Sequence, residues 1–128
     1  MQEKPLFEYA IVRIVPRVER GEFLNVGVVM YCRNEKFLDV MITLNEAKLI
    51  ALFPEVELNE IRTHLQAFEQ ICKGNPDAGP IAKLDITSRF RWLTARRSTV
   101  VQTSEVHPGL CTDAKNTLSK LHKELVLD

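Results

Sequence analysis

The sequence predicts an α+β protein with a mainly antiparallel four-stranded sheet and helices packed on one face, which makes a two-layer sandwich. Three strand-like segments come first, helical periodicity follows, and one more strand-like segment precedes a final helical segment. The 128 residues, of which 45% are hydrophobic, are sufficient for one core and contain no recognisable linker. We therefore expect residues 1–128 to form a single domain.

The first three strands are predicted by β-branched and aromatic composition. Residues 7–15 have this composition and end before Pro16, which cannot donate to a sheet ladder. Residues 23–32 are apolar at almost every position, which indicates a central strand, and Gly27 within them predicts a bulge or a close backbone approach. Residues 37–43 alternate apolar and polar side chains. Short turns join these segments into a meander.

Two helices are expected after the meander. Asn45 is a good N-cap for a short helix that ends before Pro54. Residues 57–73 repeat apolar side chains at spacings of three and four, which predicts a longer amphipathic helix. A loop at 74–80 follows.

The last third of the chain predicts a helix, a strand and another helix. Asp85 or Thr87 is expected to cap the first of these helices, and residues 98–104 are typical of a strand. This fourth strand follows a long helical segment, so a place at the sheet edge and a place between earlier strands both stay open. Residues 107–109, His-Pro-Gly, predict a turn before a terminal helix that starts near Asp113.

Composition narrows the function classes. The 17 Lys and Arg residues balance 17 Asp and Glu residues, whereas proteins that coat nucleic acid or anionic membranes need a positive surplus. The N-terminus has no apolar leader, and no apolar run approaches the ~18 residues that span a bilayer. We expect a cytoplasmic protein whose partners are neither membranes nor, in the main hypothesis, nucleic acid.

No metal or cofactor is predicted. The three cysteines and three histidines are dispersed and lack the spacing of zinc ligands, so the cysteines are expected as buried reduced thiols. His64 and His122 are expected at the boundaries of apolar helix faces. Residues 74–79 lack the Lys-Ser/Thr ending of a phosphate-binding loop.

The most unusual segment is basic and aromatic. Residues 89–99 carry four arginines and Trp92 without an acidic residue. Guanidinium groups bind phosphate and carboxylate bidentately, so the segment predicts an anion-binding surface, although solvated or ion-paired arginines and a core tryptophan also explain it. Polar side chains on the following strand and its exit turn extend this surface. The candidate ligand-binding residues are Arg89, Arg91, Trp92, Arg97, Ser98, Gln102, Ser104 and His107.

His107 is the one catalytic candidate. A histidine beside arginines can act as acid or base, but His-Pro-Gly is also ordinary turn chemistry. Its spacing of four from Cys111 does not by itself predict a nucleophile and base pair. Arg13 on the first strand and Arg17 in the charged turn after it are candidate partner-binding residues. For Arg13, an edge position, a buried ion pair and an extension of the basic pocket stay open.

Four phrases, at residues 9–29, 89–95, 97–104 and 106–111, resemble the bacterial family catalogued as domain of unknown function 3037 (DUF3037). The resemblance implies a small bacterial protein without assigned activity, encoded beside a HipA-like serine/threonine kinase. Positions that fit the pattern are Arg89, Arg91, Trp92, Thr94, Arg97, Ser98, Gln102, Ser104, His107 and Gly109. Arg96 and Glu105 stand where the pattern leads us to expect prolines, and both change the charge beside the predicted pocket.

These observations support three functional hypotheses. The main one is an accessory or antitoxin-like interaction module for a HipA-like kinase, with an Arg/Trp-rich surface that receives an acidic or phosphorylated group. The second is an enzyme acting on a phosphate ester or nucleotide, in which Arg91 and Arg97 clamp the anion and His107 is the acid or base. The third is a nucleic-acid-binding module. Whether the protein is an enzyme stays open, with a non-enzymatic role favoured.

Overall fold

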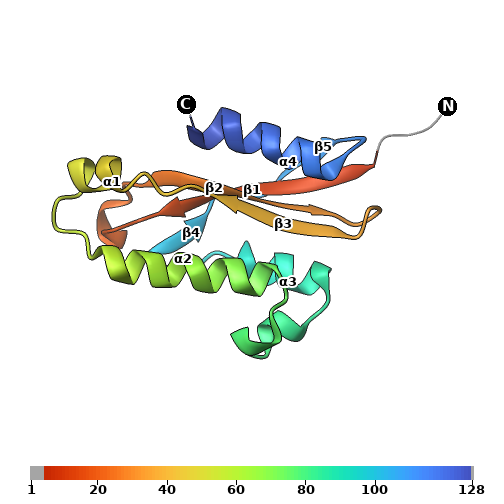
Figure 1. Cartoon of the computed structure of the whole chain (residues 1–128), viewed down its shortest axis with the longest axis horizontal. Coiled ribbons are helices and arrows are strands. Elements are labelled where there is room, and N and C mark those ends of the chain that lie inside the picture. The colour runs from red at the N-terminus through yellow and green to blue at the C-terminus, as the bar shows by residue number, and fades with distance from the viewer. Residues whose placement is uncertain (1–4, 128) are drawn as a thin grey trace.

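The computed structural model describes residues 5–127 and contains an antiparallel sheet between two layers of helices (Figure 1). The strand order is β3-β2-β1-β4, and β5 pairs with β1 beside β4. The strands are β1 (Leu6–Ile14), β2 (Leu24–Cys32), β3 (Phe37–Ile42), β4 (Val101–Thr103) and β5 (His107–Leu110). The helices are α1 (Glu46–Leu52), α2 (Leu58–Cys72), α3 (Ile86–Leu93) and α4 (Ala114–His122), the last followed by a π-helical turn at Lys123–Leu127.

The α+β class and the mainly antiparallel sheet are confirmed, but the sheet has five strands where four were predicted. The expected turn at 107–109 is wrong, because these residues belong to β5, which pairs with the first half of β1. Gly109 lies opposite Phe7, and a Cβ on Gly109 would come within 2.5 Å of the Phe7 ring. The aromatic ring therefore packs directly over the glycine backbone, a tertiary contact that outweighs the local turn preference.

Helices cover both faces of the sheet, not one face as predicted. Helices α2 and α3 pack on one face, and α4 packs on the opposite face (Figure 1). The reason lies in β2, whose side chains are almost all buried, so that each face needs its own apolar cover. Val26 and Val29 belong to the core beneath α2 and α3, whereas Val28 and Met30 belong to the core beneath α4.

The predicted irregularity at Gly27 is confirmed. A Cβ at this position would lie 2.6 Å from the Met41 carbonyl oxygen of β3, so the neighbouring backbone requires glycine. The β1–β2 register also shifts between Val12 and Arg13, because Val26, next to Gly27 in β2, is the extra residue of a bulge.

Side-chain caps set the helix starts. Asn45 accepts from the amide of Lys48 and begins α1, as predicted. Of the two caps considered for α3, Asp85 is the one that acts, because its side chain accepts from the Ser88 amide. This cap sets where α3 begins and therefore the position of the basic segment along the helix.

His122 is buried at 3% exposure, so its predicted place at a helix boundary is wrong. Its Nε2 lies 2.8 Å from Thr43 Oγ1, and its Nδ1 is buried without a hydrogen-bond partner among the described residues. Burial lowers the pKa of His122, because the charged ring would lose its hydration. The π-helical turn continues directly from this residue.

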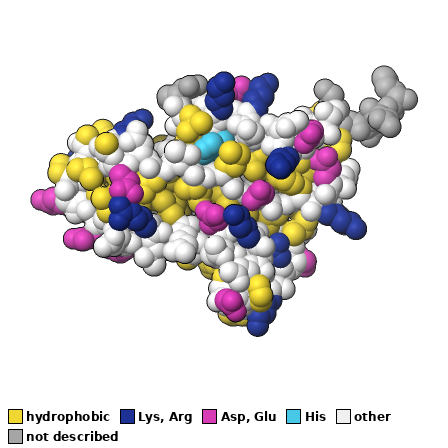
Figure 2. All heavy atoms as spheres, viewed as in Figure 1, with side chains coloured by type: hydrophobic (Ala, Val, Ile, Leu, Met, Phe, Trp, Pro, Cys, Tyr) yellow, Lys and Arg dark blue, Asp and Glu magenta, His cyan; other side chains and the backbone are white. Residues whose placement is uncertain are grey.

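The three cysteines are buried free thiols, as predicted. Burial raises the pKa of Cys72 to about 12. The visible surface in Figure 2 mixes Lys and Arg with Asp and Glu, and hydrophobic side chains show between the two helix layers. Within residues 5–127, no helix is both long and apolar enough to cross a membrane.

Candidate functional site

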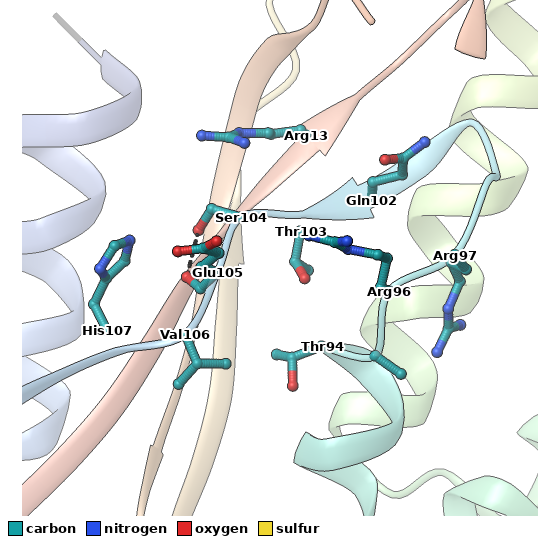
Figure 3. A pocket seen from close by; sticks show the side chains of 11 residues that line it. Arg13, Thr94, Arg96, Arg97, Gln102, Thr103, Ser104, Glu105, Val106 and His107 are labelled. Carbon is teal, nitrogen blue, oxygen red and sulfur yellow. Dashed lines mark hydrogen bonds between the residues drawn. The ribbon is translucent and has the colours of Figure 1, made fainter. Parts of the chain in front are cut away.

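A cleft of about 720 Å³ lies where the loop after α3 meets the edge of the sheet (Figure 3). Arg13 contributes from β1, residues 94–97 contribute from the loop, and residues 102–107 contribute from β4 and the segment that joins it to β5. The cleft thus combines parts of the chain that are about ninety residues apart in sequence.

The edge of the sheet is interrupted at the cleft. Thr103 pairs with Val12 and His107 pairs with Tyr9, so three residues, 104–106, lie opposite two residues of β1. The extra residue makes a bulge, which bends an edge strand and changes the direction of its side chains. Residues 104–106 therefore face the cleft from an irregular backbone.

Ser104 replaces the missing backbone pairing at this bulge. Its Oγ accepts the Ile11 N–H at 2.8 Å, and its own N–H donates to the Ile11 carbonyl at 2.8 Å. The same hydroxyl donates to the Glu105 carbonyl at 2.9 Å, drawn as the dashed line in Figure 3. Ser104 is only 7% exposed, so its hydroxyl mainly holds the bulge in place.

Arg97 is held against Trp92. The guanidinium carbon lies 4.0 Å from the centre of the indole ring, and Nη2 donates to the Trp92 carbonyl. Thr94 ends α3 by donating from Oγ1 to the Phe90 carbonyl at 2.8 Å. Partial burial lowers the pKa of Arg97, but an arginine stays charged at every physiological pH.

Arg13 lies on the first strand next to Gln102, its partner in the β1–β4 register. Its guanidinium carbon is 4.0 Å from the Phe23 ring centre, and its Nε donates to Asn25 Oδ1 at 3.4 Å. Partial burial lowers the pKa of Arg13. Of the three positions considered for this residue, the structure places it at the basic pocket.

The lining carries more positive than negative charge. Arg13, Arg96 and Arg97 stand against Glu105, which leaves a formal charge of plus two. Among residues 5–127, none of the three arginines forms an ion pair with a carboxylate. The cleft therefore holds positive charge that the described part of the chain does not neutralise, and an anion that entered it would find several guanidinium donors.

Two of the predicted arginines lie outside the cleft lining. Arg91 forms a bidentate ion pair with Glu8 at 3.1 and 2.8 Å. Arg89 donates from Nη1 to the Leu84 carbonyl at 2.6 Å, packs beside Gly74, and has its Nε buried without a hydrogen-bond partner in the described region. The two-arginine clamp predicted from Arg91 and Arg97 is therefore not assembled at the cleft.

The other candidates divide between the cleft and its surroundings. Trp92 is half-buried and stacks against Arg97, but it does not line the cleft. Ser98 is exposed outside the lining, and Arg17 pairs with Glu19 at 2.8 Å on the surface of a different groove. Gln102, Ser104 and His107 do line the cleft, as the sequence grouped them.

His107 lies on the side of the cleft away from Arg97 (Figure 3). It is exposed, and its ring centre is 5.3 Å from that of Tyr9. No side chain among the described residues hydrogen-bonds to the imidazole, so nothing in that region orients it as a general base. Its acid or base role stays a prediction.

Sequence reasoning did not place Thr94, Arg96, Thr103 or Glu105 among the site residues, although all four line the cleft. A signal existed for two of them, because Arg96 and Glu105 were recognised as charged departures from the family pattern. Thr94 was also among the positions that fit the family pattern, whereas for Thr103 the signal was only its proximity in sequence to candidates.

Fold and cleft together define an α+β protein with a basic cleft at an interrupted sheet edge. The chain belongs to the family described as Protein of unknown function (DUF3037), whose model matches residues 9–126. This confirms the resemblance seen in the sequence, and the matched range contains the whole cleft lining. No curated protein and no solved structure matches the chain.

Proposed function

We propose that this protein is an interaction module that binds an acidic or phosphorylated group of a partner protein in the basic cleft. The observation that carries the proposal is that Arg13, Arg96 and Arg97 all line one cleft without a carboxylate partner among residues 5–127. Partly buried guanidinium groups have lost hydration, and an anion restores the lost interactions through charge-assisted hydrogen bonds.

The charge of the cleft favours a compact anion over a polyanion. Glu105 faces the same space as the three arginines, so the lining attracts a single phosphate or carboxylate group but repels an extended phosphate backbone at one point. The formal net charge of the whole chain is zero, which provides no general attraction to nucleic acid. We therefore place the nucleic-acid hypothesis behind the protein-partner hypothesis.

Binding is favoured over catalysis by the surroundings of His107. An acid or base is normally held by a second group, and no hydrogen bond from a described side chain holds this imidazole. Arg91, which the enzyme hypothesis needs for its clamp, is engaged by Glu8. Arginines would bind an anion in the cleft, but no acid or base is held there to transfer a proton to or from it.

A HipA-like serine/threonine kinase is the first partner to test. The resemblance noted in the sequence is the reason for naming it, and a phosphorylated kinase segment has the chemistry that arginines recognise. In this proposal the protein acts in the bacterial cytoplasm as an accessory or antitoxin-like factor for that kinase.

Intrinsic fluorescence offers a direct test of the anion site. Trp92 is the only tryptophan in the chain, and it stacks with Arg97, so an anion that engages Arg97 is expected to change its emission. The change in Trp92 emission should saturate on titration with inorganic phosphate and with a phosphoserine peptide. Arg96→Ala should weaken binding by about tenfold or more, because charge-assisted hydrogen bonds contribute about 1.5–3 kcal/mol.

Arg20→Ala is the matched control, because it removes the same charge from an exposed arginine that pairs with Glu22 outside the cleft. It should change the affinity for phosphate by less than about twofold. No saturable change with either ligand, or an equal loss in both variants, would refute an anion site in the cleft.

The partner is tested separately by co-expressing the protein with a HipA-like kinase and measuring the complex by native mass spectrometry. We expect a complex that Arg96→Ala weakens and Arg20→Ala does not. Anion binding without a complex would reject this kinase and retain the cleft. Turnover of a phosphate ester that disappears in His107→Ala would replace the proposal with the enzyme hypothesis. Oligonucleotide binding with steep salt dependence would favour the nucleic-acid hypothesis.

A further inference from the structure

A second cluster of reactive side chains lies away from the cleft, where the β2–β3 turn meets the start of α4. Cys32 is the last residue of β2, Glu35 lies in the turn, and Cys111 follows β5. The two sulfur atoms and a carboxylate oxygen of Glu35 all lie within 4.8 Å of one another. Glu35 lies 3 positions after Cys32 and 76 positions before Cys111 in the chain. The fold therefore creates the cluster, and no local sequence motif predicts it.

The carboxylate is held in place from two sides. The turn closes through the Lys36 N–H, which donates to the Arg33 carbonyl at 3.1 Å, and Lys36 adopts a left-handed backbone with φ of 51°. Glu35 Oε2 accepts the N–H of Ala114, the first residue of α4, at 3.0 Å. The same oxygen lies 3.9 Å from Cys111 Sγ. Glu35 is thus fixed beside the thiols although it is exposed to solvent.

We propose that Cys32, Glu35 and Cys111 bind a zinc ion, with water as the fourth ligand. Zinc takes four ligands in a tetrahedron and accepts both thiolate sulfur and carboxylate oxygen. Around such an ion, with zinc–sulfur bonds of about 2.3 Å, neighbouring sulfur atoms lie about 3.8 Å apart. Ligand atoms already within 4.8 Å of one another need to move inward by only about 1 Å.

The donor set selects the class of metal. Two sulfur atoms disfavour calcium and magnesium, which prefer oxygen ligands, and favour zinc or another thiolate-binding ion. The cysteines are almost fully buried, whereas Glu35 is exposed, so the ion has an approach from solvent on the carboxylate side and a dry environment on the thiol side. Water from that same side would supply the fourth ligand.

Binding would join three parts of the fold. Zinc would connect the end of β2, the β2–β3 turn and the segment before α4, and it would require both thiols to lose their protons. An ion that binds only the folded protein stabilises it by mass action. At a hundredfold excess over the dissociation constant we expect the melting temperature to increase by about 10 °C.

The experiment uses the whole 128-residue chain, reduced with a phosphine that does not bind the metal. Native mass spectrometry after zinc addition should show one bound ion per chain, and cobalt added in its place should produce thiolate-to-cobalt charge-transfer absorption. Cys32→Ser and Cys111→Ser should each lose the bound zinc. Glu35→Gln should weaken zinc binding while keeping the sulfur absorption.

Cys72→Ser is the matched control, because Cys72 is equally buried but belongs to the core on the other face of the sheet. It should retain zinc and the cobalt spectrum. Absence of bound zinc on the wild-type protein, absence of the charge-transfer absorption, or equal loss in Cys72→Ser would overturn the proposal. The proposal would also be overturned if the wild-type protein bound no zinc and its mass were lower by the hydrogens that disulfide formation removes. None of these readouts involves phosphate, so they are independent of the cleft.

Discussion

Replacement of Ser104 by alanine should destabilise the protein through one identifiable defect at the β4–β5 bulge. The serine hydroxyl accepts the Ile11 N–H and donates to the Glu105 carbonyl, and alanine does neither. Ile11 lies in the centre of β1, and β2 is paired on its other side. No other strand can therefore accept a hydrogen bond from the Ile11 N–H. The substitution therefore leaves a backbone donor without its partner.

The expected magnitude follows from the two broken hydrogen bonds. An unsatisfied, partly buried N–H costs about 1–3 kcal/mol, and Glu105 is an exposed residue, so water can replace the lost donor to its carbonyl at little cost. The sum is about 2 kcal/mol of unfolding free energy. For a domain of this length, that loss corresponds to a decrease of about 8 °C in melting temperature.

Two measurements check this prediction. Urea unfolding should give the free-energy loss, and hydrogen exchange should show the Ile11 amide exchanging faster relative to its neighbours than in the wild type. Ser98→Ala is the control, because Ser98 is exposed and should change stability by less than about 0.5 kcal/mol. If Ser104→Ala is as stable as this control, or if Ile11 stays equally protected, the hydroxyl does not support the bulge.

Three other residues lead to predictions for unfolding experiments. Gly109→Ala should cost about 1–3 kcal/mol, since its Cβ would lie 2.5 Å from the Phe7 ring, and an equal penalty in a Phe7→Leu background would contradict that cause. Burial lowers the pKa of His122, so the unfolded chain takes up the proton first and stability should decrease as the pH falls below about 6.5. His122→Gln should flatten that decrease, whereas His64→Gln, at an exposed position, should not. Asn45→Ala should cost about 1 kcal/mol by removing the α1 cap, and an unchanged urea midpoint would argue against it.

Local patterns predicted most of the fold because they report burial and backbone preference directly. The continuous apolar run of β2 indicated a strand covered on both faces, and Asn45 marked the start of α1. The same run should have indicated helices on both faces, since a strand buried on each side needs two covers. The predicted two-layer arrangement overlooked this consequence of β2.

The strand β5 was not predictable from its own residues. His107, Pro108 and Gly109 favour a turn locally, and only pairing with β1 and the ring of Phe7 over Gly109 make them a strand. Contacts between segments about a hundred residues apart decide this conformation, and a local sequence pattern does not predict such contacts.

The candidate site was predicted in part. Residues two apart on a helix point about 200° apart, so Arg89 and Arg91 on α3 could not face one ligand, and this was readable from the sequence. The pairing of Arg91 with Glu8 could not be predicted from the sequence, because it joins α3 to the start of β1. Arg97 and Gln102 were correctly grouped, because the loop after α3 leads directly into β4.

The interrupted edge also determines how a partner can be held. Cys111 directs its N–H toward Pro5 of the β1 segment, and the alternation of antiparallel pairing then turns the Pro108 nitrogen outward, where it carries no hydrogen. Together with the bulge at 104–106, this removes the regular row of donors that an incoming strand would need. The edge beside the cleft is therefore unsuited to recruiting a partner by extending the sheet, and recognition there has to depend on side chains.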